Sequence, residues 1–171
     1  MSFKGYSGMK YLISKKEHLE LLGWAYSMRS MLLPNGVSPH RFFNFLKNLT
    51  DMPLVAEVGV RVLKAYGLEN TKKEDGPLGS ILSWHDTGGS VHEHIDDFNT
   101  GMLHKRFNLF LSLPISGGIP IYNGKHLDVE ERMIVPYEAD KILHSSTPVV
   151  GEKPRIIISY GWQFDKNDAC F

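Results

Sequence analysis

Residues 90–98 read SVHEHIDDF and place two imidazoles and a carboxylate at alternating positions. If this segment is an extended strand, His92, His94 and Asp96 lie on one face, because successive side chains of a strand point to opposite faces. A histidine and an aspartate two positions apart can then reach the same metal ion. Two imidazoles with one carboxylate suit a divalent transition metal and leave coordination positions open for a substrate and for oxygen.

The third ligand must come from a distant strand, and His144 in the segment DKILHS is the candidate. Arg155 follows it and opens the β-branched segment RIIISYGW, where alternation places Arg155, Ile157 and Ser159 on one face. A guanidinium at the start of such a strand needs a partner for its charge, and its planar fork matches a carboxylate. We therefore expect Arg155 to anchor an acidic ligand if that face lines a cavity.

Length and composition limit the elements that can position these groups. The chain has 171 residues, and we expect a single domain over residues 1–171. Lysine plus arginine and aspartate plus glutamate number 19 each, so the formal net charge is zero. A protein that binds many phosphates needs a basic excess, and we therefore expect no nucleic-acid partner.

The sequence also bears on the cellular compartment. The single cysteine, Cys170, cannot form an internal disulfide, so no oxidising compartment is implied. The first residues lack the apolar segment of a signal peptide, and no apolar run approaches the roughly 18 residues that span a bilayer. We expect a cytoplasmic protein with no membrane partner, and the oligomeric state is left open.

Residues 1–75 are predicted to form a helical support. Three helices are expected, each from a start signal followed by apolar residues at helical spacing. Ser14 and Glu17 fit a capping box, while Pro39 and Pro53 stand where the first turn of a helix accepts proline. The three predicted helical segments are 14–32, 38–49 and 53–67.

Residues 76–165 are predicted to form a β-rich core. Short segments rich in β-branched and aromatic residues recur at near-even spacing, and turn residues separate them, with Pro136-Tyr137 read as one such turn. This pattern is typical of a β-sandwich or jelly roll. The expected strands are Ile81–Trp84, Phe107–Leu113, Ile119–Tyr122, Arg132–Val135, Lys141–Leu143 and Arg155–Trp162.

The ordered set His94-x-Asp96, His144 and Arg155 resembles the ligand pattern of the non-haem iron(II), 2-oxoglutarate-dependent oxygenases. The phrase FNLFLSLP at 107–114, the pair Gly117-Gly118 and the segment Arg155–Gly161 are similar to small members related to the prolyl hydroxylases. The resemblance covers roughly residues 80–164. It implies a mainly β fold with N-terminal helices, in which a double-stranded β-helix (a cupin-like jelly roll) is braced by the helices.

The resemblance also implies a reaction. His94, Asp96 and His144 would hold Fe(II), and Arg155 would pair with the far carboxylate of the cosubstrate 2-oxoglutarate. With O2, such an enzyme hydroxylates an unactivated C–H of a peptidyl, amino-acid or small-molecule substrate and releases succinate and CO2. Because Asp96 is present, halogenation is disfavoured.

One position departs from the family pattern. Many relatives carry Ser or Thr two residues after the arginine to hold the same carboxylate, and here that residue is Ile157. Tyr122 and Asn108, on neighbouring predicted strands, are the candidates for this second anchor. Residues 85–91 and 98–105, which mix polar and small side chains, are the candidate lid over the site.

Two other functions remain open. Gly89, His92, His94 and Asp97 loosely match a cupin first motif with His144 as the later ligand, which would make the protein an isomerase or a cofactor-free dioxygenase. A non-enzymatic jelly-roll binding module is the second alternative. His92, or Asp97 in a bulged strand, could also replace a neighbouring ligand.

The remaining candidates have ordinary structural explanations. We expect the histidines outside the ligand set to be solvated and Arg106 to form a structural ion pair. Three large aromatic residues are expected to lie in the core or in a pocket wall. The histidines are His85, His104 and His126, and the aromatic residues are Trp84, Tyr160 and Trp162.

Overall fold

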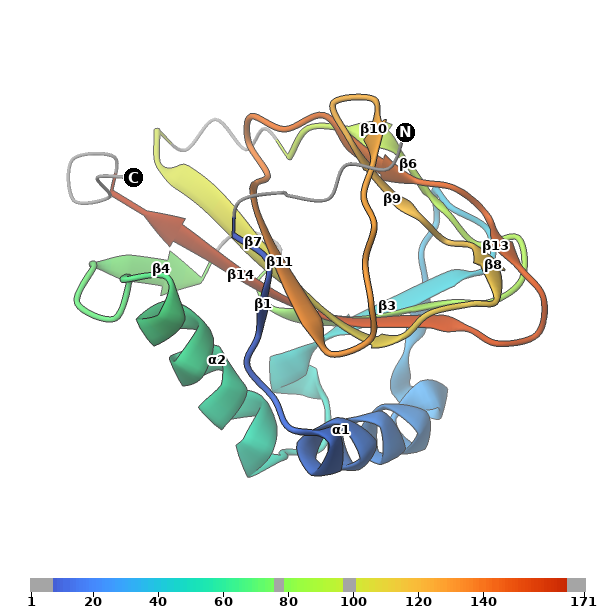
Figure 1. The fold of residues 1–171 in the computed structure, drawn as a ribbon, viewed down its shortest axis with the longest axis horizontal. Coiled ribbons are helices and arrows are strands. Elements are labelled where there is room, and N and C mark those ends of the chain that lie inside the picture. Colours follow the sequence, from blue (N-terminus) through green and yellow to red (C-terminus); the bar gives the residue numbers. More distant parts are fainter. Residues whose placement is uncertain (1–7, 76–78, 97–100, 166–171) are drawn as a thin grey trace.

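The computed structural model describes residues 8–75, 79–96 and 101–165, and its largest element is an antiparallel sheet (Figure 1). Within these residues the sheet has eight strands, which we call the major sheet. The strands run in the order β1 (Lys10–Tyr11), β11 (Met133–Glu138), β7 (Leu103–Ser112), β14 (Arg155–Phe164), β5 (Ile81–His85), β3 (Arg41–Phe45) and β2 (Leu33–Pro34), with β4 (Lys73–Asp75) pairing with β14.

The minor sheet faces the major one and completes the jelly roll. Among the described residues it has four strands, in the order β10 (Lys125–His126), β9 (Pro120–Tyr122), β12 (His144–Ser146) and β6 (Val91–His94). A short antiparallel pair, β8 (Ser116–Gly117) with β13 (Val149–Val150), lies beside it. The expected fold class, a double-stranded β-helix with N-terminal helices, is confirmed.

Two helices cover the outer face of the major sheet, on the side away from β6, β9 and β10 (Figure 1). Helix α1 (Lys15–Ser27) begins with the predicted capping box, because Glu17 N donates to Ser14 Oγ at 3.2 Å and Ser14 N donates to Glu17 Oε2 at 2.7 Å. Helix α2 (Pro53–Ala65) begins at the predicted proline. Neither helix is long and apolar enough to cross a bilayer, nor is any other helix of the described residues.

The major sheet separates two cores, and strand β14 contributes to both. Ile156, Ile158 and Tyr160 are buried against the helices, whereas Ile157 is buried between the two sheets. Side chains of a strand alternate between faces, so Arg155 lies on the same face as Ile157, as predicted. This alternation directs the guanidinium into the space between the sheets.

The predicted helix over residues 38–49 is wrong. Residues Arg41–Phe45 form strand β3, which pairs with both β2 and β5, and only the turn Leu46–Asn48 is helical, as a 3-10 turn. The sequence RFFNF satisfies a strand pattern as well as a helical one, since aromatic residues favour sheets. The open edge of β5 therefore decides the conformation, and Phe42 pairs with Trp84 across it.

Two strand boundaries also differ from the prediction. Residues 141–143 are not a strand, and β12 begins only at His144. Pro136-Tyr137 is not a turn but part of β11. Strand β1 pairs only with Met133 and Ile134, so Pro136 interrupts no hydrogen bond to β1.

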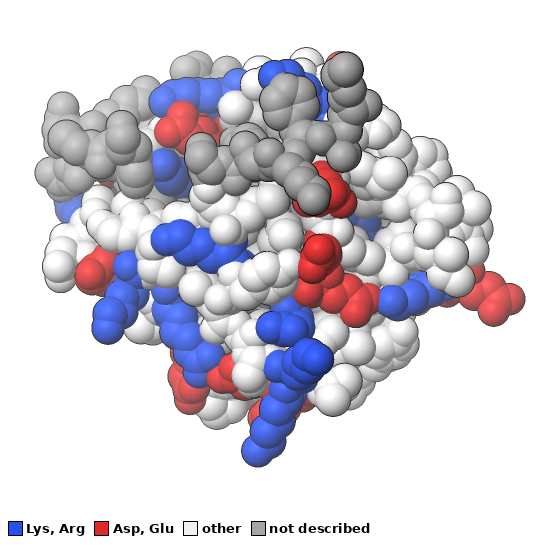
Figure 2. Space-filling model, viewed as in Figure 1, with Lys and Arg blue, Asp and Glu red and all other residues white. Residues whose placement is uncertain are grey.

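Both signs of charge occur side by side on the face shown in Figure 2, consistent with a net charge of zero. On this face, lysine and arginine side chains are interspersed with aspartate and glutamate side chains. The described residues of this face therefore form no extended patch of a single sign.

Candidate metal centre

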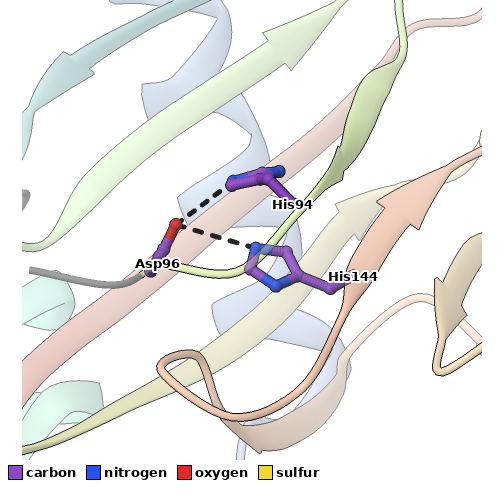
Figure 3. A group of neighbouring side chains, drawn as sticks. All are labelled: His94, Asp96 and His144. Atoms are coloured by element: carbon purple, nitrogen blue, oxygen red, sulfur yellow. Dashed lines mark ion pairs between the residues drawn. The ribbon is translucent and has the colours of Figure 1, made fainter.

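The minor sheet brings His94 and His144 together. His94 is the last residue of β6, His144 is the first residue of β12, and the two pair directly in the antiparallel register. Asp96 follows β6, and its backbone N–H donates to Ala139 O at 2.8 Å, which fixes the chain there. The three side chains converge from three backbone positions on one point (Figure 3).

The distances suit a single metal ion. One candidate ligand atom from each residue lies within 4.8 Å of the others. Nε2 of His94 is 3.1 Å from Oδ1 of Asp96, and Nε2 of His144 is 3.9 Å from the same oxygen. Ligand atoms roughly 2.1 Å from a metal and at right angles to one another are about 3 Å apart. A small contraction of this group would therefore give a facial set of three ligands.

Hydrogen bonds orient both imidazoles toward that point. Nδ1 of His94 is 2.8 Å from the carbonyl oxygen of His92, and Nδ1 of His144 is 2.8 Å from the carbonyl oxygen of Ile142. A ring nitrogen that donates to a carbonyl leaves the other nitrogen as the metal ligand. In both residues that other nitrogen is Nε2, which faces Asp96. The donor set and its supports thus fit a divalent transition metal.

The carboxylate of Asp96 is buried and ionised. Its Oδ2 accepts from Nε of Arg106 at 3.2 Å, and Nη1 of Arg106 also donates to Ser159 Oγ at 3.1 Å. Burial by itself raises the pKa of Asp96, but the hydrogen bond with His94 and the charge of Arg106 hold it well below the usual range. Arg106 therefore forms an ion pair, as expected, and its partner is the candidate metal ligand Asp96.

The two histidines differ in basicity. The hydrogen bond with Asp96 raises the pKa of His94, although partial burial opposes this shift. Desolvation lowers the pKa of His144, whose ring packs against Tyr137 with 4.9 Å between ring centroids. Tyr137 in turn packs on Tyr122 at 4.7 Å. The rings of Tyr137 and Tyr122 therefore shield the buried side of His144.

A cavity opens from the metal centre between the sheets. It is partly open to solvent, and its empty space, counted together with that open part, is about 600 Å³. Arg155, Tyr122 and Asn108 line it together with the three candidate ligands. Asn108 Nδ2 donates to the Tyr122 hydroxyl at 3.4 Å. All the residues singled out for metal and cosubstrate therefore border one space.

Arg155 is a deeply buried cation in the wall of this cavity. Its side chain is 3% exposed, and its Nε has no hydrogen-bond partner among the described residues. Desolvation lowers the pKa of Arg155 to about 10, against an opposing contribution from Tyr122. A buried guanidinium without an acidic partner is costly, so its place in the wall favours an anionic ligand.

The other predicted positions have mixed outcomes. His92 is exposed and stacks on His94 with 4.6 Å between ring centroids, outside the group that could share a metal. His85 and His104 are buried, so the expectation that they are solvated is wrong, whereas His126 is exposed as expected. Asp97 and positions 98–100 of the candidate lid lie outside the described residues.

Two cavity residues, Arg41 and His85, were not placed in the site from the sequence. Arg41 of β3 lines the same space as Arg155, but it fell within a predicted helix. The alternation of RFFNF was the available signal for a strand. His85 also lines the cavity, and its Nε2 is 3.0 Å from Ser83 Oγ.

No protein-family model matches the sequence, and no curated protein matches it. Solved structures do match. A prolyl-4-hydroxylase from Pseudomonas putida has a TM-score of 0.72 at 13% identity, over 93% of this chain and 92% of that chain. HygX from Streptomyces hygroscopicus, with nickel, 2-oxoglutarate and hygromycin B bound, has a TM-score of 0.68 at 11% identity, over 92% and 82%.

A third match is SnoN, a non-haem, α-ketoglutarate-dependent epimerase from nogalamycin biosynthesis. Its TM-score is 0.71 at 10% identity, over 91% of this chain and 77% of that chain. At such low identities these likenesses establish the fold. The chain therefore has the double-stranded β-helix fold of the 2-oxoglutarate-dependent enzymes, as its resemblance predicts, with a His94-x-Asp96…His144 group that can hold a metal inside it.

Proposed function

We propose that this protein is an Fe(II)- and 2-oxoglutarate-dependent dioxygenase. It hydroxylates an unactivated C–H of a peptidyl, amino-acid or small-molecule substrate and releases succinate and CO2. The observation that supports this most strongly is the shared cavity, in which three convergent candidate ligands border one space with a buried arginine whose Nε has no hydrogen-bond partner among the described residues. A metal site alone would need no such arginine.

The residues divide the work between metal and cosubstrate. Nε2 of His94, Oδ1 of Asp96 and Nε2 of His144 hold the Fe(II). Bound Fe(II) and 2-oxoglutarate together supply the activation of O2, and the protein supplies orientation and exclusion of water. Three protein ligands would leave other positions on the metal open, as this chemistry requires.

Arg155 holds the far carboxylate of 2-oxoglutarate. Its own strand offers Ile157 where relatives have a hydroxyl, and the Tyr122 hydroxyl and the Asn108 amide supply the second anchor. Both lie in the cavity wall and are hydrogen-bonded to each other. Tyr122 also lies near enough to Arg155 to influence its pKa, after the dominant effect of desolvation.

The proposal is tested by spectroscopy before any substrate is known. Under anaerobic conditions, addition of 2-oxoglutarate to the Fe(II) protein should produce a weak visible charge-transfer band, and air should then yield succinate. Arg155→Gln should weaken 2-oxoglutarate binding at least about tenfold, because a buried charged partner is lost. Absence of both the band and succinate would reject the oxygenase and favour a cupin-type metalloenzyme.

The metal ligands are tested with a matched pair of histidines. His94→Ala should abolish stoichiometric metal binding, whereas His92→Ala should retain it, because His92 contacts His94 through its backbone carbonyl and by ring stacking and lies outside the ligand group. Metal content should be measured after reconstitution with Fe(II), since other first-row metals compete at such sites. A wild-type protein that takes up no metal would favour the binding-module alternative.

Mass spectrometry of candidate substrates distinguishes the reaction type. Hydroxylation adds one oxygen atom to the substrate for each succinate formed. Succinate formed with a substrate of unchanged mass and altered stereochemistry would instead indicate epimerisation, the activity of one structural relative. Peptides, free amino acids and small natural products form the panel.

A further inference from the structure

Three basic side chains form one row across the face of the major sheet that lines the cavity. They are Arg41, His85 and Arg155. In the strand register, His85 of β5 pairs with Arg41 of β3 on one side and with Arg155 of β14 on the other. Directly paired residues of antiparallel strands point to the same face, and all three residues line the cavity. With strands about 4.8 Å apart, the Cα atoms of Arg41 and Arg155 are roughly 10 Å apart.

Arg41 has no acidic partner in this row. Its Nε is buried without a hydrogen-bond acceptor among the described residues. Arg106, the third arginine of the cavity wall, differs because Asp96 and Ser159 accept from it. Two of the three guanidiniums, Arg41 and Arg155, are therefore available to ligands.

The cavity lining keeps a net positive charge even after the proposed metal and 2-oxoglutarate bind. The described lining residues include three arginines and one carboxylate, that of Asp96, which pairs with Arg106. Desolvation, reinforced by Arg155 and Arg41, lowers the pKa of His85 well below its usual value, so His85 adds no charge. A divalent metal and the 2-oxoglutarate dianion cancel each other. The charges of Arg41 and Arg155 then remain in excess.

The two arginines lie at different depths. Arg155 is 3% exposed, whereas Arg41 is partly exposed. Arg41 also lines the same cavity as the candidate metal ligands His94, Asp96 and His144. Arg41 is therefore the more accessible of these two cavity arginines.

We propose that Arg41 binds a carboxylate of the primary substrate and so selects organic acids, including free amino acids, for oxidation at the neighbouring metal. The claim that the bound carboxylate belongs to the substrate rests on the proposed function. The claim that Arg41 forms an anion-binding site does not. A single planar guanidinium beside a neutral imidazole matches a carboxylate. The described lining residues include no lysine that would strengthen the binding of a phosphate.

The anion site is tested with propionate and its uncharged analogue propionamide. Protein loaded with Zn(II) and 2-oxoglutarate is titrated with each compound while the arginine Nε–H signals are followed by NMR. Propionate should shift the Arg41 signal with a saturable curve, and propionamide should not. Arg41→Gln should weaken propionate binding at least about tenfold, because a charge-assisted hydrogen bond is lost, while Arg41→Lys should retain part of it.

Two control variants make the result specific. Lys47→Gln removes a charge just after β3, beside a separate hollow near α2, and should leave propionate binding unchanged. Arg155→Gln should weaken 2-oxoglutarate binding and spare propionate binding to the loaded protein at saturating cosubstrate. Arg41→Gln should change the dissociation constant of 2-oxoglutarate by less than about threefold.

Three outcomes would overturn the inference. Arg41→Gln could weaken 2-oxoglutarate as strongly as Arg155→Gln, which would make Arg41 an anchor of the cosubstrate. Inorganic phosphate could shift the Arg41 signal at lower concentration than propionate, which would reject the carboxylate. Propionate could leave the signal unmoved. If instead the wild type binds neither metal nor 2-oxoglutarate, the proposed function fails alone, and propionate should still titrate Arg41 in the unloaded protein.

Discussion

Arg106 and Asp96 form a buried ion pair in which each carboxylate oxygen has a separate task. Oδ2 accepts from Nε of Arg106 at 3.2 Å, while Oδ1 faces Nε2 of His94 at 3.1 Å and Nε2 of His144 at 3.9 Å. Asp96 is 6% exposed and Arg106 is 3% exposed. The arginine thus holds the carboxylate in one orientation and leaves one oxygen for the metal.

Replacement of Arg106 by methionine should damage both stability and metal binding. The free energy of unfolding should fall by about 3 kcal/mol, because Asp96 would remain as a buried, uncompensated charge. Metal affinity should fall about 10- to 100-fold, since the carboxylate loses the hydrogen bond that orients it. Chemical denaturation and competitive metal titration measure the two effects.

A double variant checks that the first effect arises from the pair. Asp96→Asn combined with Arg106→Met should cost less than the sum of the two single changes, since neither charge is then left alone. Strict additivity of the three free energies would show that the two side chains do not interact in solution.

Gly118 lies against the side chain of Arg155, and its replacement by alanine should weaken 2-oxoglutarate binding several-fold. A Cβ at this position would approach Cδ of Arg155 to 3.1 Å and Cγ of Pro114 to 2.8 Å, so the arginine side chain must shift. The residue also has a φ of +62°, which alone costs alanine roughly 1 kcal/mol. Calorimetric titration with the cosubstrate measures the effect.

Gly124 separates the contact from the backbone strain. Its φ is +74°, but a Cβ added there would have no other atom within 4 Å, so Gly124→Ala carries the strain without the clash. This variant should lose a similar amount of stability and bind 2-oxoglutarate normally. Equal losses of affinity in both variants would mean that Gly118 acts through general strain rather than through Arg155.

Sequence reasoning succeeded where the signal is local or chemical. The capping box of Ser14 and Glu17 involves residues three apart, and the order His94, Asp96, His144 selects by residue type three side chains that the structure brings together. Alternation along β14 correctly placed Arg155 beside Ile157 because period-two patterning survives any arrangement of the sheets. These features depend little on the rest of the fold.

The sequence-based predictions failed where pairing with a neighbouring strand determines the conformation of a segment. Segment Arg41–Phe45 fits a helix and a strand, and only pairing with β5 selects the strand. The burial of His85 follows from the same event, because Arg41 and Arg155 pair with it on both sides. Nothing in the local sequence shows that His85 is buried, because the strands on either side of it come from distant parts of the chain. The position of Arg41 in the cavity wall could not be predicted for the same reason.

Acid should destabilise the protein in part through Glu17. Hydrogen bonds from the Ser14 backbone and from Arg61 lower the pKa of Glu17 from 4.5 to about 2. A carboxylate with a lowered folded-state pKa stabilises the protein above its unfolded-state value, and this stability is lost as pH falls toward about 2. Between these limits the wild type should lose about 1 kcal/mol more than Glu17→Gln, after allowance for solvent screening.

Urea unfolding at a series of pH values measures that difference. Glu20→Gln, at an exposed position of the same helix, is the matched control and should follow the wild type. Parallel stability curves for Glu17→Gln and the wild type over this interval would show that the capping box and Arg61 contribute nothing to the acid sensitivity.

Alanine in place of the two interior helix glycines should change stability in opposite directions. At Gly23 of α1 nothing lies within 4 Å of the new Cβ, so Gly23→Ala should stabilise the protein by up to about 1 kcal/mol through helix propensity. At Gly59 of α2 the Cβ would meet Cε1 of Tyr160 at 3.2 Å. That ring cannot easily retreat, because it is buried and its hydroxyl donates to Val55 O at 2.8 Å.

Overpacking of this kind costs roughly 1–3 kcal/mol, which exceeds the gain in propensity, so Gly59→Ala should lower the free energy of unfolding. Thermal and urea unfolding of both variants test the contrast directly. If Gly59→Ala stabilised the protein as much as Gly23→Ala, α2 and β14 would be packed loosely enough to accommodate the added methyl group. The helices would then brace the major sheet, and the floor of the cavity it carries, less firmly than the packing of Tyr160 indicates.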